Sequence, residues 1–194
     1  NVADLVLAAG LFSHVMLLAK GIQLGTPSEE LIKKKNLEEF IVKSREILSK
    51  YNDKIRLPID FGYIDSEERK ELPIEKLPLE KSPLMDLGSK TIDQYKKIII
   101  EAKTIFLNGP VGVFEVEETG LGTKSILSAI AESNAFSVLG GGDTITALNK
   151  YGLLDKISYV STGGGALIRF LSGEDLPGIK ALKKSAELYP MEER

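Results

Sequence analysis

Short apolar runs alternate along this chain with segments whose apolar residues recur at helical spacing. The runs are typical of strands buried on both faces and cover residues 4–9, 54–59, 103–107, 135–138 and 157–160. Helical spacing follows or precedes them, for example at Ile92, Tyr95 and Ile99. This alternation predicts an α/β fold: a doubly wound, mostly parallel sheet with helices on both faces, in a Rossmann-like three-layer sandwich.

Two features change this regular pattern. Residues 61–77 are rich in charge and proline, with β-like pieces at 62–64 and 72–74, which predicts a small β-hairpin excursion. Thr26-Pro27-Ser28-Glu29 has the pattern of a capping box and predicts a helix that runs to about Lys50, with Lys33–Lys35 on its solvated face. Because no linker or repeat interrupts the chain, we expect one domain over residues 1–194.

Composition narrows the function classes. The 194 residues carry a formal net charge of -3, which argues against a broad basic surface for nucleic acid. The chain has no cysteine, which excludes disulfides and thiolate metal sites. The apolar stretch at residues 5–19 is shorter than the ~20 residues that a membrane helix needs. We therefore expect a cytoplasmic protein with neither a nucleic-acid nor a membrane partner.

Two glycine clusters follow the last two predicted strands, and each opens a predicted helix. They are Gly140-Gly141-Gly142-Asp143-Thr144 and Ser161-Thr162-Gly163-Gly164-Gly165-Ala166. Glycines at such a turn let a ligand touch the backbone, and the helix N-terminus favours an anion. Because both turns follow parallel strands, we expect them at one sheet edge around a phosphate-rich ligand. The alternative is tight packing without a ligand.

Other residues add to this edge or are excluded from chemistry. Asn108 directly follows the predicted strand at 103–107 and could donate a hydrogen bond to a phosphate. Asp143 either caps its helix or faces a phosphate-bound Mg²⁺, which takes one or two carboxylates. His14, the only histidine, lies among apolar residues and indicates a structural role. Neither a Walker A motif nor the G-x-G-x-x-G dinucleotide pattern is present, which disfavours a nicotinamide oxidoreductase.

Three segments together resemble the signatures of phosphoglycerate kinase, in that family's order and at about its spacing. They are residues 107–115 (Leu-Asn-Gly-Pro-Val-Gly-Val-Phe-Glu), 140–144 and 161–166. Ala8-Ala9-Gly10 is similar to a turn that borders the adenine pocket in that family, and residues 84–88 resemble its G-L-D-x-G loop, with Leu84 where glycine is usual. The resemblance covers essentially the whole chain and is to the C-terminal, nucleotide-binding half, with residues 22–37 and 65–72 more similar to archaeal than to bacterial members. It implies that the first strand of that half and the N-terminal half are absent.

The resemblance implies reversible phosphoryl transfer between 1,3-bisphosphoglycerate and MgADP, giving 3-phosphoglycerate and MgATP in glycolysis. The enzyme would be a phosphotransferase with a carboxyl acceptor, and its phosphoglycerate substrates would bind the missing N-terminal domain. Gly163, Gly164 and Gly165 would stabilise the transferring group, and Asp143 would face Mg²⁺. ADP or ATP with Mg²⁺ would be held by Gly10, Asn108, Pro110, Gly112, Val113, Glu115, Gly140, Gly141, Gly142, Asp143 and Thr144. We expect the chain to be inactive alone; the alternative is a stand-alone nucleotide-binding domain without catalysis.

Overall fold

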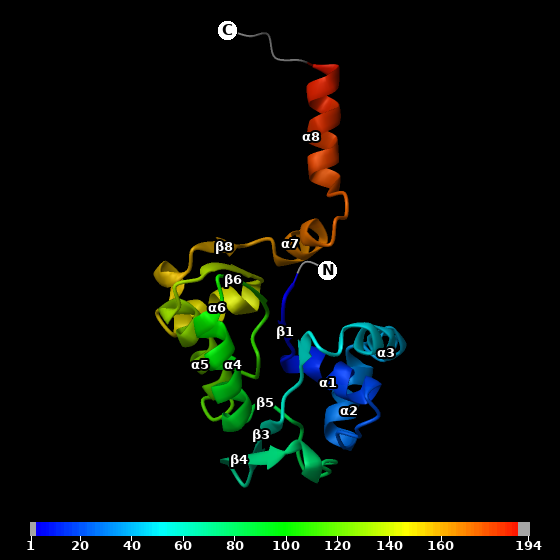
Figure 1. The fold of residues 1–194 in the computed structure, drawn as a ribbon, viewed down its shortest axis with the longest axis vertical. Coiled ribbons are helices and arrows are strands. Elements are labelled where there is room, and N and C mark those ends of the chain that lie inside the picture. Colours follow the sequence, from blue (N-terminus) through cyan, green and yellow to red (C-terminus); the bar gives the residue numbers. More distant parts are fainter. Residues whose placement is uncertain (1–2, 190–194) are drawn as a thin grey trace.

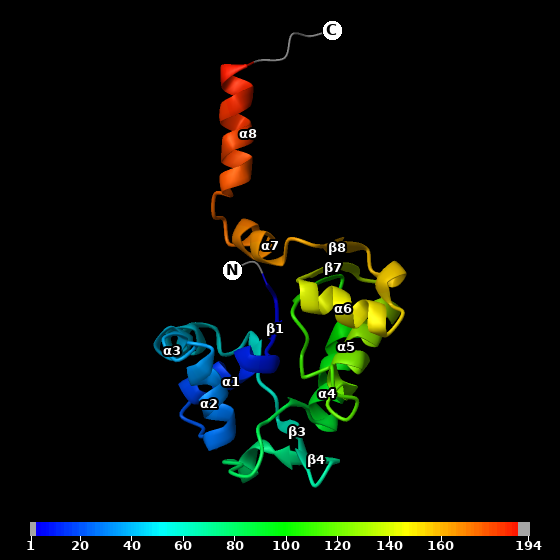
Figure 2. The ribbon, with the colours of Figure 1, turned by 180° about the vertical axis from the view of Figure 1, so that it is seen from behind.

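The computed structural model describes residues 3–189 and has two lobes above a β-hairpin, with one helix projecting away (Figure 1). The first lobe consists of β1 (Val6–Leu7), α1 (Gly10–Ala19), α2 (Thr26–Lys34), α3 (Phe40–Tyr51) and β2 (Ile55–Arg56). The hairpin region consists of β3 (Asp60–Asp65), β4 (Glu68–Pro73), the 3-10 helix η1 (Ile74–Lys76) and β5 (Asp86–Leu87). The second lobe consists of α4 (Ser89–Glu101), β6 (Thr104–Asn108), α5 (Leu121–Glu132), β7 (Phe136–Gly140), α6 (Gly142–Lys150), η2 (Leu154–Lys156) and β8 (Tyr159–Ser161). The last two helices are α7 (Gly164–Leu171) and α8 (Pro177–Leu188), and α8 projects from the molecule in both views (Figure 2).

The strand pairing confirms the α/β class. β1 pairs with β2, and β6, β7 and β8 pair in that order, all in parallel, whereas β3 pairs antiparallel with β4 and β5. The strands form three separate sheets instead of the single sheet expected from the sequence. Within residues 3–189, no strand pairs with the second edge of β1 or with the second edge of β6. The hairpin is confirmed and is longer than predicted.

The predicted helix from Thr26 to about Lys50 is wrong, because the chain breaks into α2 and α3. α2 ends at Lys34, and Asn36 adopts a left-handed conformation with φ 54°, which is a common way to end a helix. At the start of α2 the cap position belongs to Gly25, one residue earlier than the capping box predicts. Glu29 reaches further back than the capping box predicts: its Oε1 accepts hydrogen bonds from the N–H groups of Leu24 and Gly25 at 2.9 and 3.4 Å, whereas the Thr26 N–H donates to Glu80 Oε2 at 3.1 Å.

The main hydrophobic core lies between the β6–β8 sheet and helices α4, α5 and α6. Leu139, Ile130 and Leu148 are fully buried in it, and Ile92, Tyr95 and Ile99 join it from α4 as predicted. The hydroxyl of Tyr95 lies 2.9 Å from the carbonyl oxygen of Ala8 and 2.8 Å from that of Arg56. One side chain of the second lobe therefore ties down the ends of β1 and β2.

Among the described residues, no helix covers the opposite face of the β6–β8 sheet, and its large side chains are exposed to solvent. Phe106, Phe136 and Tyr159 share that face by their register and are about half exposed, at 46, 58 and 55%. His14 lies in the interior of the first lobe with 4% exposure, which agrees with the structural role predicted for it. The lysine run at 33–35 is exposed, as predicted. None of the helices described between residues 3 and 189 combines the length and the apolar character needed to cross a membrane.

Candidate functional site

The carboxyl ends of three parallel strands meet at one edge of the second lobe. Asn108, Gly140 and Ser161 are the last residues of β6, β7 and β8 and lie side by side in the sheet register. The loops that follow these residues therefore begin at the same edge. This is the edge at which ligands bind in open α/β sheets.

The N-termini of α6 and α7 touch each other at this edge. Gly141 occupies the cap position of α6 with φ 99°, a conformation that favours glycine, and Gly163 occupies the cap position of α7. A Cβ atom on Gly164 would lie 2.7 Å from both the Cα and the N of Gly141. The two glycine clusters therefore lie at one sheet edge, as the sequence predicts, and they also pack backbone against backbone. Two helix N-termini bring partial positive charge to one place.

The side chain of Asn108 lies beside this junction. Cβ atoms built on Gly140, Gly141 and Gly164 would lie 3.4, 3.3 and 2.9 Å from its Oδ1 atom. The side chain is thus held between the two glycine turns, and its residue is exposed. An amide here can donate to or accept from an anion bound at either helix.

Thr144 and Asp143 occupy different environments on α6. The Oγ1 atom of Thr144 accepts a hydrogen bond from the Gly109 N–H at 2.8 Å, and the residue is 1% exposed. In this structure the Thr144 hydroxyl therefore holds the end of β6 against α6. Asp143 is exposed in the first turn of α6, and because Gly141 holds the cap position, the capping role considered for Asp143 is not seen.

The β6–α5 loop (residues 109–120) carries the other predicted site residues. Its backbone is fixed from several elements: Gly112 N–H donates to Thr123 Oγ1 at 3.2 Å, and Val113 N–H donates to the Met85 carbonyl at 2.8 Å. Lys150 Nζ donates to the Phe114 carbonyl at 2.6 Å from the end of α6. Val113 is 38% exposed, and Glu115 is exposed beside it. Both side chains are thus accessible on a loop whose backbone is fixed.

Gly10 reaches this loop from the first lobe. Its N–H donates to the Val111 carbonyl at 3.1 Å, and a Cβ on Gly10 would lie 3.3 Å from the carbonyl oxygen of Pro110. Gly10 also has φ 54°, which favours glycine. The structure therefore brings the predicted residues Gly10 and Pro110 together, although 100 positions separate them in the printed sequence.

Arg69 and Asp86 lie directly beneath the loop; the sequence did not single out Arg69, and it included Asp86 only within the segment 84–88. The carboxylate of Asp86 on β5 is fully buried and accepts hydrogen bonds from Arg69 Nη1 at 2.9 Å and from the Gly122 N–H at 2.8 Å. Burial raises the pKa of Asp86 to about 6, against the opposing effects of Gly122 and Arg69. The sequence signals for this acid are its place as the aspartate of residues 84–88, which resemble a G-L-D-x-G loop, and its apolar neighbours Leu84, Met85 and Leu87.

The donor set limits what metal the site could hold. In the part of the chain that the structure describes, no three acidic or histidine side chains gather into a ligand cluster. Asp143 is thus the one exposed carboxylate at the start of α6. Such a single carboxylate fits a cation that takes most of its ligands from phosphates and water, as Mg²⁺ does.

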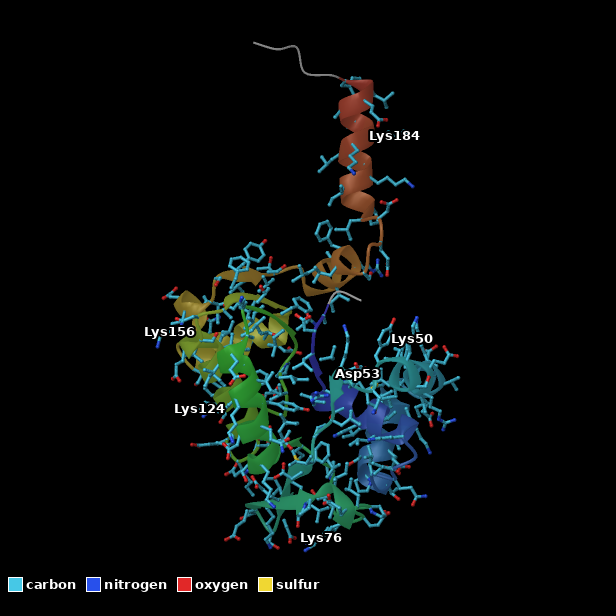
Figure 3. The ribbon with its side chains drawn as sticks, viewed as in Figure 1. Lys50, Asp53, Lys76, Lys124, Lys156 and Lys184 are labelled. Carbon is cyan, nitrogen blue, oxygen red and sulfur yellow. The ribbon has the colours of Figure 1, made fainter. Side chains whose placement is uncertain are left out.

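The labelled lysines in Figure 3 lie on separate elements and form no common patch; they are Lys50, Lys76, Lys124, Lys156 and Lys184.

Comparison with known proteins gives one consistent family. The model of the family described as phosphoglycerate kinase matches residues 1–174. Phosphoglycerate kinase of Pyrococcus abyssi is 44% identical over 190 residues, which cover 96% of this chain and 46% of the relative. That of Methanothermus fervidus is 43% identical over 183 residues, which cover 94% of this chain and 44% of the relative.

Solved structures give the same result. The crystal structure of phosphoglycerate kinase from Pyrococcus horikoshii matches with a TM-score of 0.87 and 44% identity, over 95% of this chain and 46% of that one. The structure from Coxiella burnetii matches with a TM-score of 0.82 and 34% identity, over 95% and 47%. The chain therefore spans about half the length of the relatives it matches.

Proposed function

Since the chain belongs to the phosphoglycerate kinase family, we propose that residues 1–194 form a single domain, the ADP/ATP-binding half of such an enzyme. The complete enzyme would transfer a phosphoryl group reversibly between 1,3-bisphosphoglycerate and MgADP. The phosphoglycerate would be bound by a part of the protein outside these residues. We place this activity in the cytoplasm, as a step of glycolysis, without a nucleic-acid or membrane partner.

The observation that carries the proposal is the junction of two helix N-termini beside Asn108. Cβ atoms on Gly142 and Gly165 would meet no atom within 4 Å, so open space lies beside both helix starts, where first-turn backbone N–H groups can bind phosphate oxygens. The β and γ phosphates would lie there, along Gly140–Gly142 and Gly163–Gly165, with Asn108 between them. Glu115 would accept from the ribose hydroxyls, and Gly10, Pro110, Gly112 and Val113 would border the base.

The residues present fit Mg²⁺ that arrives with the nucleotide. Asp143 would hold it by one carboxylate, and the phosphates would supply further oxygens. When bound, the ion neutralises charge on the phosphates and polarises the bond to the transferred group. Thr144, whose hydroxyl is committed to Gly109 in this structure, would hold the phosphate-binding turn in place.

The chain's own residues would act by alignment and charge stabilisation. The acceptor in the reverse direction is a carboxylate, which is already ionised at neutral pH, so the reaction needs no general base. The glycine N–H groups at the start of α7 would donate to the equatorial oxygens of the transferring group as their charge develops. The helix N-terminus adds its partial positive charge at the same place.

Titration calorimetry with MgADP, combined with a coupled turnover assay, tests the proposal. We expect the 194-residue chain to bind MgADP with no measurable kinase turnover, because it spans about half of its relatives. Failure to bind MgADP or MgATP would overturn the nucleotide assignment. Turnover at ordinary kinase rates by homogeneous material would overturn the assignment of the substrate site to another part of the protein. A stand-alone nucleotide-binding domain predicts the same binding but no gain of activity when the other half of a phosphoglycerate kinase is supplied.

A further inference from the structure

The hairpin β3–β4 supplies a partly buried cation, Arg69, to the underside of the β6–α5 loop. Arg69 on β4 reaches across β3, and its guanidinium lies flat on Gly62, where a Cβ atom would lie 2.6 Å from Nη1. From there Nη1 donates to Asp86 Oδ2 at 2.9 Å and to the Glu118 carbonyl at 3.0 Å, and Nη2 donates to the Leu87 carbonyl at 2.8 Å. One side chain thus joins the hairpin, β5 and the far end of the loop.

The Asp86 carboxylate lies in direct contact with the backbone at Gly112 and Gly122, between that backbone and the Arg69 guanidinium. A Cβ on Gly112 would lie 2.3 Å from Asp86 Oδ1, and one on Gly122 would lie 2.2 Å from it. Both glycines therefore let the backbone rest directly on the carboxylate. Oδ1 has no hydrogen-bond partner among the described residues, whereas Oδ2 accepts from both Arg69 and Gly122. A carboxylate held this way is a rigid support for the two ends of the loop.

We propose that Asp86 and Arg69 are positioning residues: an ion pair, with a buried carboxylate and a guanidinium side chain that is 16% exposed, which fixes the position of the β6–α5 loop and so shapes the nucleotide site beside it. The expected effect on nucleotide affinity rests on the proposed function, whereas the effect of the ion pair on the loop does not. The hairpin is then part of the binding apparatus, although neither of its strands ends at the site.

The contacts to the loop lead directly to predicted ligand-binding residues. Gly112 lies on Asp86, and the next residue, Val113, donates its N–H to the carbonyl of Met85, the neighbour of Asp86. The position of β5 is therefore transmitted to residues 112 and 113 without an intervening flexible segment. Removing the negative charge would weaken the bonds from Arg69 and Gly122, because hydrogen bonds to ionised groups are about twice as strong as neutral ones.

Protonation of Asp86 should have the same effect as its amide substitution. The charged and titratable groups around it are Arg69 and, through Arg69, Glu71 on β4, together with Tyr151 after α6 and, beyond Tyr151, Glu115 in the loop. Burial raises the pKa of Tyr151, and the negative charges of Asp86 and Glu115 raise it further, so that Tyr151 stays neutral. Asp86 is therefore the group in this set that changes charge near pH 6.

The test compares Asp86→Asn with Asp65→Asn in the 194-residue chain. Asp65 is a matched control, because it is an ion-paired carboxylate of the same hairpin, bound to Lys70 and Lys81, with no contact to the loop. We expect Asp86→Asn to raise the Kd for MgADP about five-fold or more at pH 7.5, and Asp65→Asn to change it less than two-fold. As the pH falls towards 5.5, the Kd of the unsubstituted chain and of Asp65→Asn should approach that of Asp86→Asn. The nucleotide's own titration is common to all three and cancels.

Amide hydrogen exchange without nucleotide separates this proposal from the proposed function. In Asp86→Asn, the N–H groups of Val113 and Gly122 should exchange faster, while those in the middle of α4 should not. If the unsubstituted chain does not bind MgADP, the proposed function fails, and exchange alone decides: local acceleration supports the anchor, and unchanged or uniform exchange overturns it. An unchanged Kd in a folded Asp86→Asn protein also overturns it.

A second variant covers the case in which Asp86→Asn does not fold. Arg69→Lys keeps the positive charge but cannot bond to Asp86, Glu118 and Leu87 at once, because an ammonium lacks the planar fork of a guanidinium. We expect this variant to raise the Kd for MgADP several-fold and to speed exchange at Gly122. A Kd within two-fold of the unsubstituted value would overturn the proposal.

Discussion

At the residue scale, a carboxylate from one element stabilises the start of another. Asp60 on β3 is 3% exposed, and it accepts hydrogen bonds from the N–H groups of Lys90 and Thr91 at 3.0 and 2.9 Å. These residues lie in the first turn of α4, where the cap residue Gly88 has no side chain to offer. Asp60 thus caps the N-terminus of α4 from a different element, in place of a side chain at the cap position.

Asp60→Ala should therefore lower the free energy of unfolding by about 2 kcal/mol, because it leaves N–H groups at the start of α4 without an acceptor. Urea unfolding monitored by circular dichroism measures this change. Asp93→Ala on the exposed side of the same helix is the control, and it should stay within about 0.5 kcal/mol of the unsubstituted chain. Equal effects of the two substitutions would contradict the capping role.

The two buried groups His14 and Asp86 give the free energy of unfolding opposite pH dependences. Burial lowers the pKa of His14 to about 4 and raises that of Asp86 to about 6. The stability linked to neutral His14 is present above pH 6.5 and is lost as the pH falls towards 4. The stability linked to protonated Asp86 is present below pH 3.8 and is lost as the pH rises through 6. Each amounts to about 3 kcal/mol, and the two oppose each other between pH 4 and 6.

Asp86→Asn should therefore make stability rise more steeply between pH 4.5 and 6.5 than in the unsubstituted chain, and His14→Leu should make it rise less steeply or fall. Urea unfolding at both pH values gives the two slopes. The difference between variant and unsubstituted slopes removes the contribution of the other carboxylates. Parallel slopes in all three proteins would show that neither group titrates as its burial implies.

Asp143 is exposed, so its substitution should change the affinity for the nucleotide more than the stability of the fold. Asp143→Ala should weaken binding of MgADP more than binding of metal-free ADP, because a carboxylate attracts the complexed cation and repels the bare phosphate. Calorimetry with Mg²⁺ and with a chelator provides the comparison. Asp155→Ala in η2, also exposed, is the control. Equal weakening of both forms by Asp143→Ala would exclude a role in holding the metal.

At the element scale, the site depends on the contact between α6 and α7. Gly164→Ala would force a Cβ to within 2.7 Å of the Gly141 backbone, whereas a Cβ on Gly165 meets no atom within 4 Å. We expect Gly164→Ala to destabilise by about 1–3 kcal/mol, as overpacking does. Gly165→Ala, in the same turn, should be stabilising by up to about 1 kcal/mol through helix propensity. Thermal melting of the two variants measures this; a similar shift for both would contradict the close contact.

At the scale of the whole molecule, apolar surface is left uncovered. Phe136 on the bare face of the β6–β8 sheet is 58% exposed, and Leu182 on the projecting α8 is 73% exposed. Within residues 3–189, β1 and β6 each have one edge without a paired strand. Exposed apolar patches and unpaired edges recruit other chains.

The 194-residue chain should therefore associate as its concentration rises, with an average mass by light scattering above 21.2 kDa. Phe136→Lys combined with Leu182→Lys should shift the mass towards the monomer. Val42→Lys on α3, whose side chain is 63% exposed on the other lobe, is the matched control and should have little effect. A monodisperse monomer at all concentrations would contradict the prediction.

The sequence by itself determined the class of fold, the order of its elements and the segments that meet at the site. Local signals suffice for these: buried strands read as short apolar runs, and glycines after a strand mark the turns. Gly141 and Gly164, which the sequence placed at one sheet edge, do touch. The family resemblance also came from contiguous motifs.

The tertiary structure alone decided what supports those segments. The cap that Asp60 gives to α4 and the Arg69–Asp86 pair beneath the loop both depend on contacts between residues far apart in the chain. The separation into three sheets was likewise invisible in strand patterns, because an apolar run predicts burial without naming its neighbour. Periodicity and spacing record what a residue is and how its near neighbours fold, whereas a long-range partner is specified only by packing.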